Sequence, residues 1–89
     1  DISLKENIET ITSFDIRKLR PVEFDWKEDG EHAAGFIAQE MEEVLPHIVS
    51  EAEGIKKISY QQVIPYLVAV IQDMQSDINN LKKQLKDKN

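Results

Sequence analysis

The last third of the chain carries an apolar repeat that a lone helix cannot bury on itself. From Ile64 onward, apolar side chains recur at alternating spacings of three and four residues. This spacing is typical of a coiled-coil seam, in which two positions of every heptad face a partner. It predicts an amphipathic helix that packs on further copies of itself or on the rest of its own chain. The seam consists of Ile64, Leu67, Ile71, Met74, Ile78, Leu81 and Leu85.

The seam helix, residues 59–89, has recognisable ends. Ser59 is a suitable N-cap, and Gln62 follows three residues later, as in a capping box. Pro65 lies beyond the first turn, so we expect it to kink the helix or to end a short first turn. Cations suit the C-terminal end of a helix dipole. That end holds Lys82, Lys83, Lys86 and Lys88.

The apolar face of this helix narrows along its length. Valines widen the face near its start, and polar residues border it farther along. The valines that widen the face are Val63, Val68 and Val70. The polar residues that border it farther along are Asp77, Lys82 and Gln84. We therefore expect the first half to dock on a globular head and the second half to project into an oligomeric bundle. The order of Ile and Leu favours two strands, and the wide face allows three.

Length and charge limit the function classes. A chain of 89 residues forms one small domain whose core is barely sufficient alone, so oligomerisation would help it. The absence of cysteine excludes a disulfide framework and thiolate metal sites. A formal charge of -6 argues against a nucleic-acid partner. No apolar run reaches membrane-spanning length, and no signal peptide opens the chain. The chain begins at Asp1 without a methionine, so we expect it to be a fragment.

Residues 1–58 predict a globular head that begins with a helix and a hairpin. Apolar spacing from Ile8 to Leu19 predicts a helix that Pro21 ends, with Ser13 as an N-cap for its second part. Alternation of apolar and polar residues over 22–26 predicts a half-buried strand. The Asp-Gly pair at 29–30 predicts a turn. A return strand is expected over 31–37, with a bulge at position 35. We expect the core to contain Phe24, Trp26, Phe36 and Ile37.

The rest of the head predicts a second helix and a second hairpin. Residues 38–45 read as a short amphipathic helix that Pro46 ends. Short strands are expected at 47–49 and 55–58, joined by a loop through residues 53–54. Short helices alternating with hairpins, without a βαβ rhythm, indicate an α+β fold.

Candidate chemical groups are few. The two histidines, His32 and His47, lie far apart in the sequence, and we interpret both as ordinary hairpin or surface residues rather than metal ligands. The acidic residues of the second helix lie opposite its apolar stripe, which indicates a solvated face rather than an acid–base pair; they are Glu40, Glu42 and Glu43. No glycine-rich phosphate loop or serine elbow is present, so no cofactor and no metal are expected.

Three segments, in order, carry a resemblance to a known family. Residues 4–8 read LKENI, residues 19–26 read LRPVEFDW, and residues 35–40 read GFIAQE. Pro46 with Val49, then Tyr60, and the seam helix follow them. Together they resemble the self-cleaving C-terminal intramolecular chaperone domain of phage tailspikes, endosialidases, neck appendages and tail fibres. This is the tailspike-type serine peptidase family, with a related domain in myelin regulatory factor. The resemblance covers nearly the whole chain.

The resemblance implies a homotrimer at the C-terminus of a phage fibre. Such a domain holds three chains in register, templates an upstream β-helical stalk of the same polypeptide, and then cuts itself off. It implies action in the cytoplasm of the infected bacterium during virion assembly, and absence from the mature virion. Neither a nucleic acid nor a membrane is expected as a partner. The competing interpretations are a permanent trimerisation or adaptor module without protease activity, and a regulatory coiled-coil module for another protein's helix.

The resemblance also implies a serine–lysine dyad. The nucleophilic serine would directly precede Asp1, and Lys5 would be the general base, because a desolvated lysine amine can take a proton from a serine hydroxyl. The chain as given lacks that serine, and Ser3 is too close to Lys5 to replace it. It therefore reads as the released, inactive product of cleavage before Asp1, or as a chain designed without the serine. Attack within one chain and attack between protomers are both compatible with the sequence.

Overall fold

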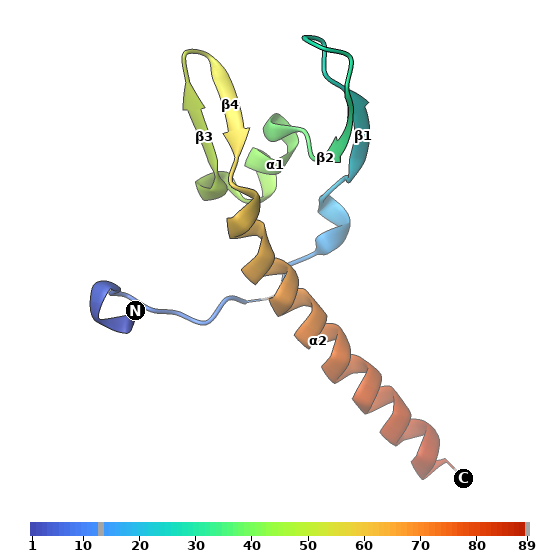
Figure 1. Cartoon of the computed structure of the whole chain (residues 1–89). Helices are drawn as coiled ribbons and strands as arrows, with labels where there is room; N and C mark the ends of the chain where they lie inside the picture. The colour runs from blue at the N-terminus through green and yellow to red at the C-terminus, as the bar shows by residue number, and fades with distance from the viewer. Residues whose placement is uncertain (13, 89) are drawn as a thin grey trace. The chain divides into compact units, whose positions relative to one another are not determined.

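The computed structural model describes residues 1–12 and 14–88. It contains short helical turns, two hairpins and one long helix (Figure 1), which confirms the predicted α+β class. The 3-10 turns are η1 (Ile2–Leu4), η2 (Ile16–Lys18) and η3 (Pro46–Ile48). The strands are β1 (Val22–Asp25), β2 (His32–Gly35), β3 (Val49–Ala52) and β4 (Ile55–Ile58), and the helices are α1 (Ala38–Val44) and α2 (Tyr60–Asp87).

The chain divides into two compact units. One, called here the hairpin unit, is Asp15–Ile64. The other, called the helix unit, joins Asp1–Phe14 to Pro65–Asn89. The predicted division into a head at 1–58 and a helix at 59–89 stays a prediction.

The first hairpin matches its sequence signals. β1 and β2 pair antiparallel, and Gly35 lies directly opposite Val22 in the ladder, so the predicted bulge at Gly35 is wrong. The loop closes with the N–H of Trp26 donating to the carbonyl of Glu31 at 2.9 Å. Gly30 occupies the left-handed region at φ 75°, which explains the glycine of the Asp-Gly pair. The return strand is shorter than predicted because it ends at Gly35.

The second hairpin begins later than predicted. Residues Pro46–Ile48 form the 3-10 turn η3 instead of a strand, because proline fixes φ near the helical value at a first helical position. β3 starts at Val49 and pairs antiparallel with β4 through a two-residue turn. Both turn residues, Glu53 and Gly54, have positive φ, at 54° and 77°. Positive φ at both positions is the geometry of the type I′ turn, which suits the twist of two strands.

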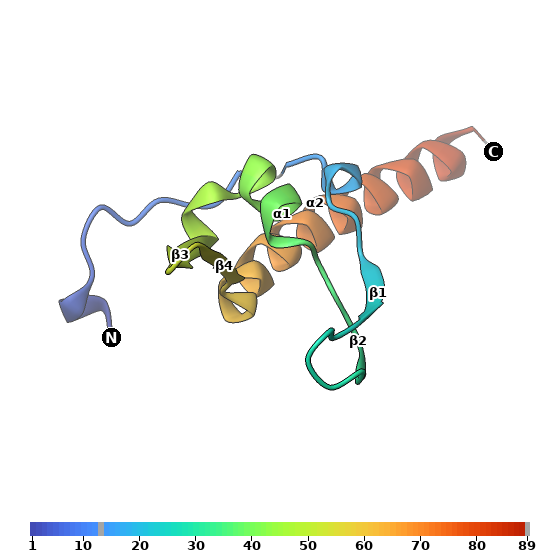
Figure 2. The same ribbon diagram turned by 90° about the horizontal axis from the view of Figure 1, so that it is seen from above.

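Helix α1 supplies the centre of the hairpin unit. It lies between the two hairpins in both ribbon views (Figure 2), and Met41 on its inner face keeps only 1% of its surface exposed. Leu45 follows the helix and is also buried, as the apolar stripe predicted. The other buried residues of this unit are Leu19, Ile48 and Val63.

The helix predicted from Ile8 to Leu19 is wrong. Among the described residues of this stretch, the one helical element is the turn η2, and the Asp15 carboxylate caps it by accepting the N–H of Arg17 at 3.0 Å. The stretch is rich in β-branched residues, which lower helix propensity, and a short helix without packing is marginal in water. The N-cap predicted at Ser13 lies outside the described residues.

The predicted aromatic core is also wrong. Phe24, Phe36 and Ile37 are half-buried, and Trp26 keeps 55% of its surface exposed. Phe24 and Trp26 pack edge to face, with ring centroids 4.8 Å apart. Each hairpin is a two-stranded sheet, a form that buries little apolar surface by itself, and the described residues leave the Trp26 side of the first hairpin open.

Helix α2 confirms the predicted long C-terminal helix. It begins at Tyr60, directly after Ser59, and the N–H of Gln62 donates to the Ser59 carbonyl at 3.1 Å. The helix continues through Pro65, so Pro65 does not end a short first turn. Proline there removes only the N–H that would donate to the Gln61 carbonyl.

Candidate functional site

The seam on α2 is open to solvent. From Ile71 to Leu85, every seam residue keeps between 45% and 66% of its surface exposed. Ile64 is exposed and Leu67 is half-buried. Val63 and Val70 are buried, whereas Val68 is exposed. A row of exposed Ile, Leu and Met side chains on one helix face is apolar surface that monomeric proteins rarely leave open, and it usually marks a protein interface.

From Ile71 onward, the residues of α2 outside the seam are polar. The side-chain amide of Gln75 donates to the Asn79 side chain at 3.1 Å, a contact between residues four apart on one face. Lys86 lies in the last turn, where a cation interacts favourably with the helix dipole. The polar side of α2 is thus suited to contact with water, whereas the exposed seam is apolar.

The N-terminal segment, residues 1–12, begins with a closed turn. The Asp1 carboxylate accepts the N–H of Ser3 at 3.1 Å, and the Asp1 carbonyl accepts the N–H of Leu4 at 3.2 Å. The N–H of Lys5 donates to the Ile2 carbonyl at 3.1 Å. A 3-10 turn rises only about 2 Å per residue, against about 3.3 Å in an extended chain. The turn therefore keeps Lys5 near the Asp1 end, with its side chain exposed to solvent.

The hairpin unit has an open hollow with a volume of about 630 Å³. We call it the aromatic hollow, because Phe24 and Trp26 of the first hairpin line it together with Phe36 and Tyr60. Side chains of β4 add Lys56, Lys57 and Ile58 to the lining. Its walls are thus mainly apolar, with two lysines as the charged groups.

Tyr60 shapes one wall of the aromatic hollow. Its hydroxyl accepts the N–H of Phe36 at 3.1 Å, and its ring stacks on the Phe36 ring with centroids 6.3 Å apart. A Cβ at Gly35 would collide with this hydroxyl, so the glycine lets the start of α2 approach the end of β2. Sequence reasoning assigned Gly35 to a bulge and gave Tyr60 no structural role.

Ion pairs tie α1 to its neighbours. The Arg20 guanidinium donates two hydrogen bonds to the Glu40 carboxylate, at 2.9 Å and 2.6 Å. These bonds lower the pKa of Glu40 and raise that of Arg20. Lys56 pairs with Glu42, which raises the pKa of Lys56. The predicted acidic face is open to solvent, since Glu40 and Glu42 keep 42% and 38% of their side-chain surface exposed and Glu43 is exposed; the sequence did not indicate its two ion pairs.

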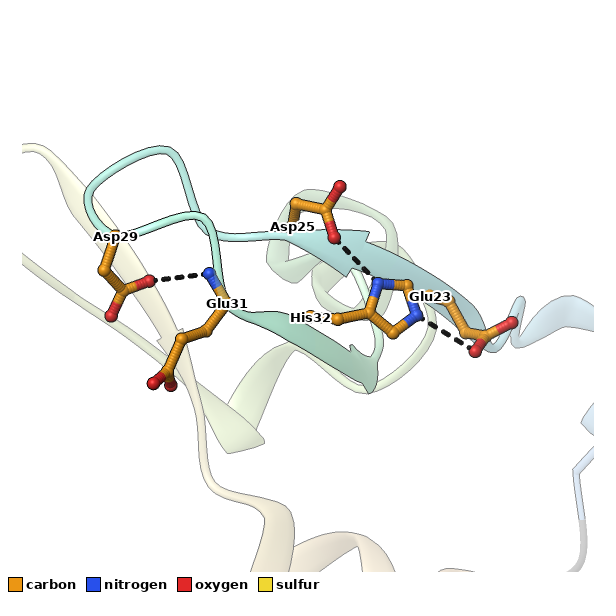
Figure 3. A network of polar contacts seen from close by, with 5 residues as sticks. All are labelled: Glu23, Asp25, Asp29, Glu31 and His32. Atoms are coloured by element: carbon orange, nitrogen blue, oxygen red, sulfur yellow. Dashed lines mark hydrogen bonds and ion pairs between the residues drawn. The ribbon is translucent and has the colours of Figure 1, made fainter.

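His32 has carboxylate partners that the sequence analysis missed. Figure 3 shows its ring on β2 reaching two side chains of β1. Nδ1 lies 2.7 Å from Oδ1 of Asp25, and Nε2 lies 3.1 Å from Oε1 of Glu23. The hydrogen bond to Asp25, and then that to Glu23, raise the pKa of His32 by favouring the imidazolium. Asp25 faces His32 across the ladder, so a strand register could have identified this pair.

The described residues hold neither a metal-binding cluster nor a membrane-spanning helix. Among residues 1–12 and 14–88, no three His, Cys, Asp or Glu side chains gather closely enough to hold a metal ion. Within the same residues, no helix is long and apolar enough to cross a membrane. The roles predicted for Asp1 and Lys5, and the trimer predicted at the seam, stay predictions.

Comparisons with known proteins place these features in a family. Residues 1–50 match the model of a peptidase family described as "Chaperone of endosialidase". The chain is also 38% identical over 74 residues to the "Long tail fiber protein Gp37" of Salmonella phage S16, covering 74% of this chain. The chain spans 10% of the length of that relative. No solved structure gives a significant match. The matched residues and the identity show that this chain belongs to the chaperone of endosialidase family.

Proposed function

We propose that this chain is an intramolecular chaperone of a phage tail fibre. It forms a homotrimer along the α2 seam, templates the folding of an upstream segment of the same polypeptide, and is released by self-cleavage just before Asp1. The single observation that carries the proposal is the exposed seam on a helix from a chaperone family. The similarity to a long tail fiber protein supports the choice of a fibre as the folding client.

The seam suits a register-setting role. A helix of 28 residues extends for about 42 Å, long enough for several heptads to interlock with partner helices. Each interlocked heptad fixes the axial position of the copies, so the upstream chains leave the bundle at the same level. Three copies follow from the family and its three-chain fibres, not from the Ile and Leu pattern.

Self-cleavage is proposed with Lys5 as the general base. A serine directly before Asp1 in the precursor supplies the nucleophile. As its hydroxyl proton passes to the neutral Lys5 amine, the serine oxygen bonds to the carbonyl carbon of the serine–Asp1 peptide bond, in the same chain or in a neighbouring protomer, and the bond from that carbon to the Asp1 nitrogen breaks. The protonated Lys5 amine gives its proton to the departing nitrogen, which becomes the new N-terminus. Water then hydrolyses the ester, which leaves a carboxylate on the upstream segment and restores the serine hydroxyl. The turn η1 supports this assignment because it holds Lys5 close to the bond that is cut. Lys5 is exposed in the single chain, so desolvation of its amine would have to come from assembly.

The test uses a precursor that carries the upstream segment and the serine. We expect Lys5→Ala and Lys5→Arg to give folded trimers that stay uncut, since arginine keeps its proton. Lys27→Ala, in the loop of the first hairpin, removes a lysine to which the mechanism gives no role, and this variant should be cut normally. Processing of either Lys5 variant at the wild-type rate would show that Lys5 is not the base.

A second candidate function is a permanent trimerisation module without a protease step. The exposure of Lys5 in the single chain favours it, because a solvated lysine is a poor base. The mass of the expressed precursor separates the two functions: a single uncut species at full length supports the permanent module.

The proposed release by self-cleavage also predicts where the domain acts. It should act in the cytoplasm of the infected bacterium and be absent from the mature virion, which proteomics of purified virions would check.

A further inference from the structure

We infer that the aromatic hollow is a docking site for the N-terminal segment of a second copy of this chain. The inference rests on the proposed assembly of several copies. It adds a second interface to the seam, and it places Lys5 inside that interface. Both surfaces are already present in each copy, so no other partner is required.

The hollow has the properties of a peptide-binding site. Its volume of about 630 Å³ lies within the usual range of about 300–1,000 Å³ for ligand pockets. Two aromatic pairs form its walls, Phe24 with Trp26 and Phe36 with Tyr60. Trp26 and Tyr60 are both exposed in the single chain, although aromatic side chains of this size contribute most when covered. An apolar occupant would cover them.

The N-terminal segment has matching apolar groups. Ile2, Leu4 and Ile8 keep 63–86% of their surface exposed. Beyond η1, residues 5–12 have no regular secondary structure, so their backbone is available to adapt to a groove. The hollow and these three side chains are both open in the single chain, so each is available to a second copy.

The charges of the two surfaces are complementary. Among the described residues, the hollow is lined by two lysines, Lys56 and Lys57, and by no carboxylate. Within the described part of the chain, Lys56 pairs with Glu42, and Lys57 is exposed with no ion pair. The N-terminal segment carries three carboxylates against one lysine: Asp1, Glu6 and Glu9 against Lys5. Docking brings an acidic apolar segment to a basic apolar hollow, a combination that favours this occupant over a neutral one.

A second copy fits the symmetry and the reach of the segment. Each copy offers one segment and one hollow, which is a heterologous contact, and such contacts close into a ring when three copies surround an axis. The segment is held at one end, where Phe14 packs edge to face on Tyr66 with centroids 6.1 Å apart. Residues 5–12, which follow η1 and have no regular secondary structure, span about 26 Å when extended, which gives the segment its reach toward a neighbouring copy.

Docking would explain why cleavage waits for assembly. Lys5 lies between Leu4 and Glu6, so burying Leu4 in a neighbour's hollow also removes the Lys5 amine from bulk water. Desolvation lowers the pKa of a lysine amine and so supplies the neutral form that a general base needs. A chain that has not assembled keeps Lys5 exposed and uncut.

The test uses the only tryptophan of the chain as a reporter, because Trp26 lines the hollow. As the concentration of the full chain rises and sedimentation shows assembly, Trp26 emission should shift to shorter wavelength and iodide quenching should fall at least twofold. Leu4→Asp and Ile8→Asp should abolish this shift in the assembled state. Ile55→Asp is the matched control, since Ile55 is exposed on β4 but does not line the hollow, and it should leave the shift unchanged.

A charge exchange tests the pairing directly. Lys57→Glu alone should weaken the shift at a given concentration, and adding Glu6→Lys with Glu9→Lys should restore it. If the Trp26 emission shift survives Leu4→Asp and Ile8→Asp, another occupant fills the hollow. If the shift is already present in dilute monomer, the segment docks within one chain. Either result overturns the inference. An assembled chain with an unprotected Trp26 also overturns it but leaves the proposed trimer intact. A chain that never assembles in sedimentation refutes both.

Discussion

Replacing Ile78 by aspartate should weaken assembly of the chain by at least about a hundredfold. Ile78 lies at the middle of the projecting seam and keeps 45% of its surface exposed in the single chain. Fully burying an isoleucine side chain contributes about 1.5–3 kcal/mol, so the part still open corresponds to about 1 kcal/mol per copy. Three copies give about 3 kcal/mol, which is about a hundredfold in the association constant. A carboxylate in an apolar seam adds a desolvation cost, so the total should reach several kcal/mol.

Sedimentation equilibrium over a concentration series measures this effect. Asn80→Asp is the matched control, because it adds the same charge to the same turn of α2 but outside the seam. We expect wild type and Asn80→Asp to assemble alike and Ile78→Asp to be displaced to much higher concentration. Equal assembly of all three would refute the seam as the interface. A stable wild-type monomer at every concentration would refute the trimer itself.

Other perturbations test the hairpin unit, each by urea unfolding unless stated. Gly35→Ala should destabilise it by about 1–3 kcal/mol, because the new Cβ collides with the Tyr60 hydroxyl, and adding Tyr60→Phe should recover part of the loss. The hydrogen bond to Asp25 is the main cause of the raised pKa of His32. The contribution of this histidine to the free energy of unfolding should therefore be complete below about pH 6.5 and disappear as pH rises through the folded-state pKa. An unraised pKa in an NMR titration would contradict this. Trp26→Ala should cost about 1 kcal/mol or less rather than the roughly 3–5 kcal/mol of a core position, because Trp26 is 55% exposed; a core-sized loss would contradict that exposure.

Local signals in the sequence predicted the elements that follow local rules. The Asp29-Gly30 turn and the Glu53-Gly54 loop correspond to real hairpin turns, because glycine is placed where φ is positive. Ser59 and the seam predicted the start and length of α2, because caps and heptads are properties of neighbouring residues. The helix predicted from Ile8 was wrong because its formation depends on packing, which the local spacing does not report. Its apolar spacing was correct for a helix, but Ile8 and Ile16 keep 63% and 38% of their surface exposed, so little packing stabilises one there.

The site features that the sequence missed all depend on tertiary structure. Gly35 faces a tyrosine 25 positions away, and Arg20 pairs with Glu40 across 20 positions, so no local pattern reports either contact. Trp26 was expected in the core because large apolar residues usually are buried. Alternation along a strand identifies the face on which a side chain lies. It does not reveal whether another element covers that face, and here none among the described residues covers it fully.

The size of the core argues that folding and assembly are linked in this chain. The buried side chains of the hairpin unit are few, with Met41 at the centre, and the unit has the length at which a single core is only marginally stable. Its largest apolar side chain, Trp26, is left open beside the hollow, and the seam of α2 is left open as well. Covering either surface with a second copy adds stability that depends on concentration, because a partner that binds only the folded state shifts the folding equilibrium. The free energy of unfolding of such a chain should therefore be higher when its copies are assembled than when they are separate.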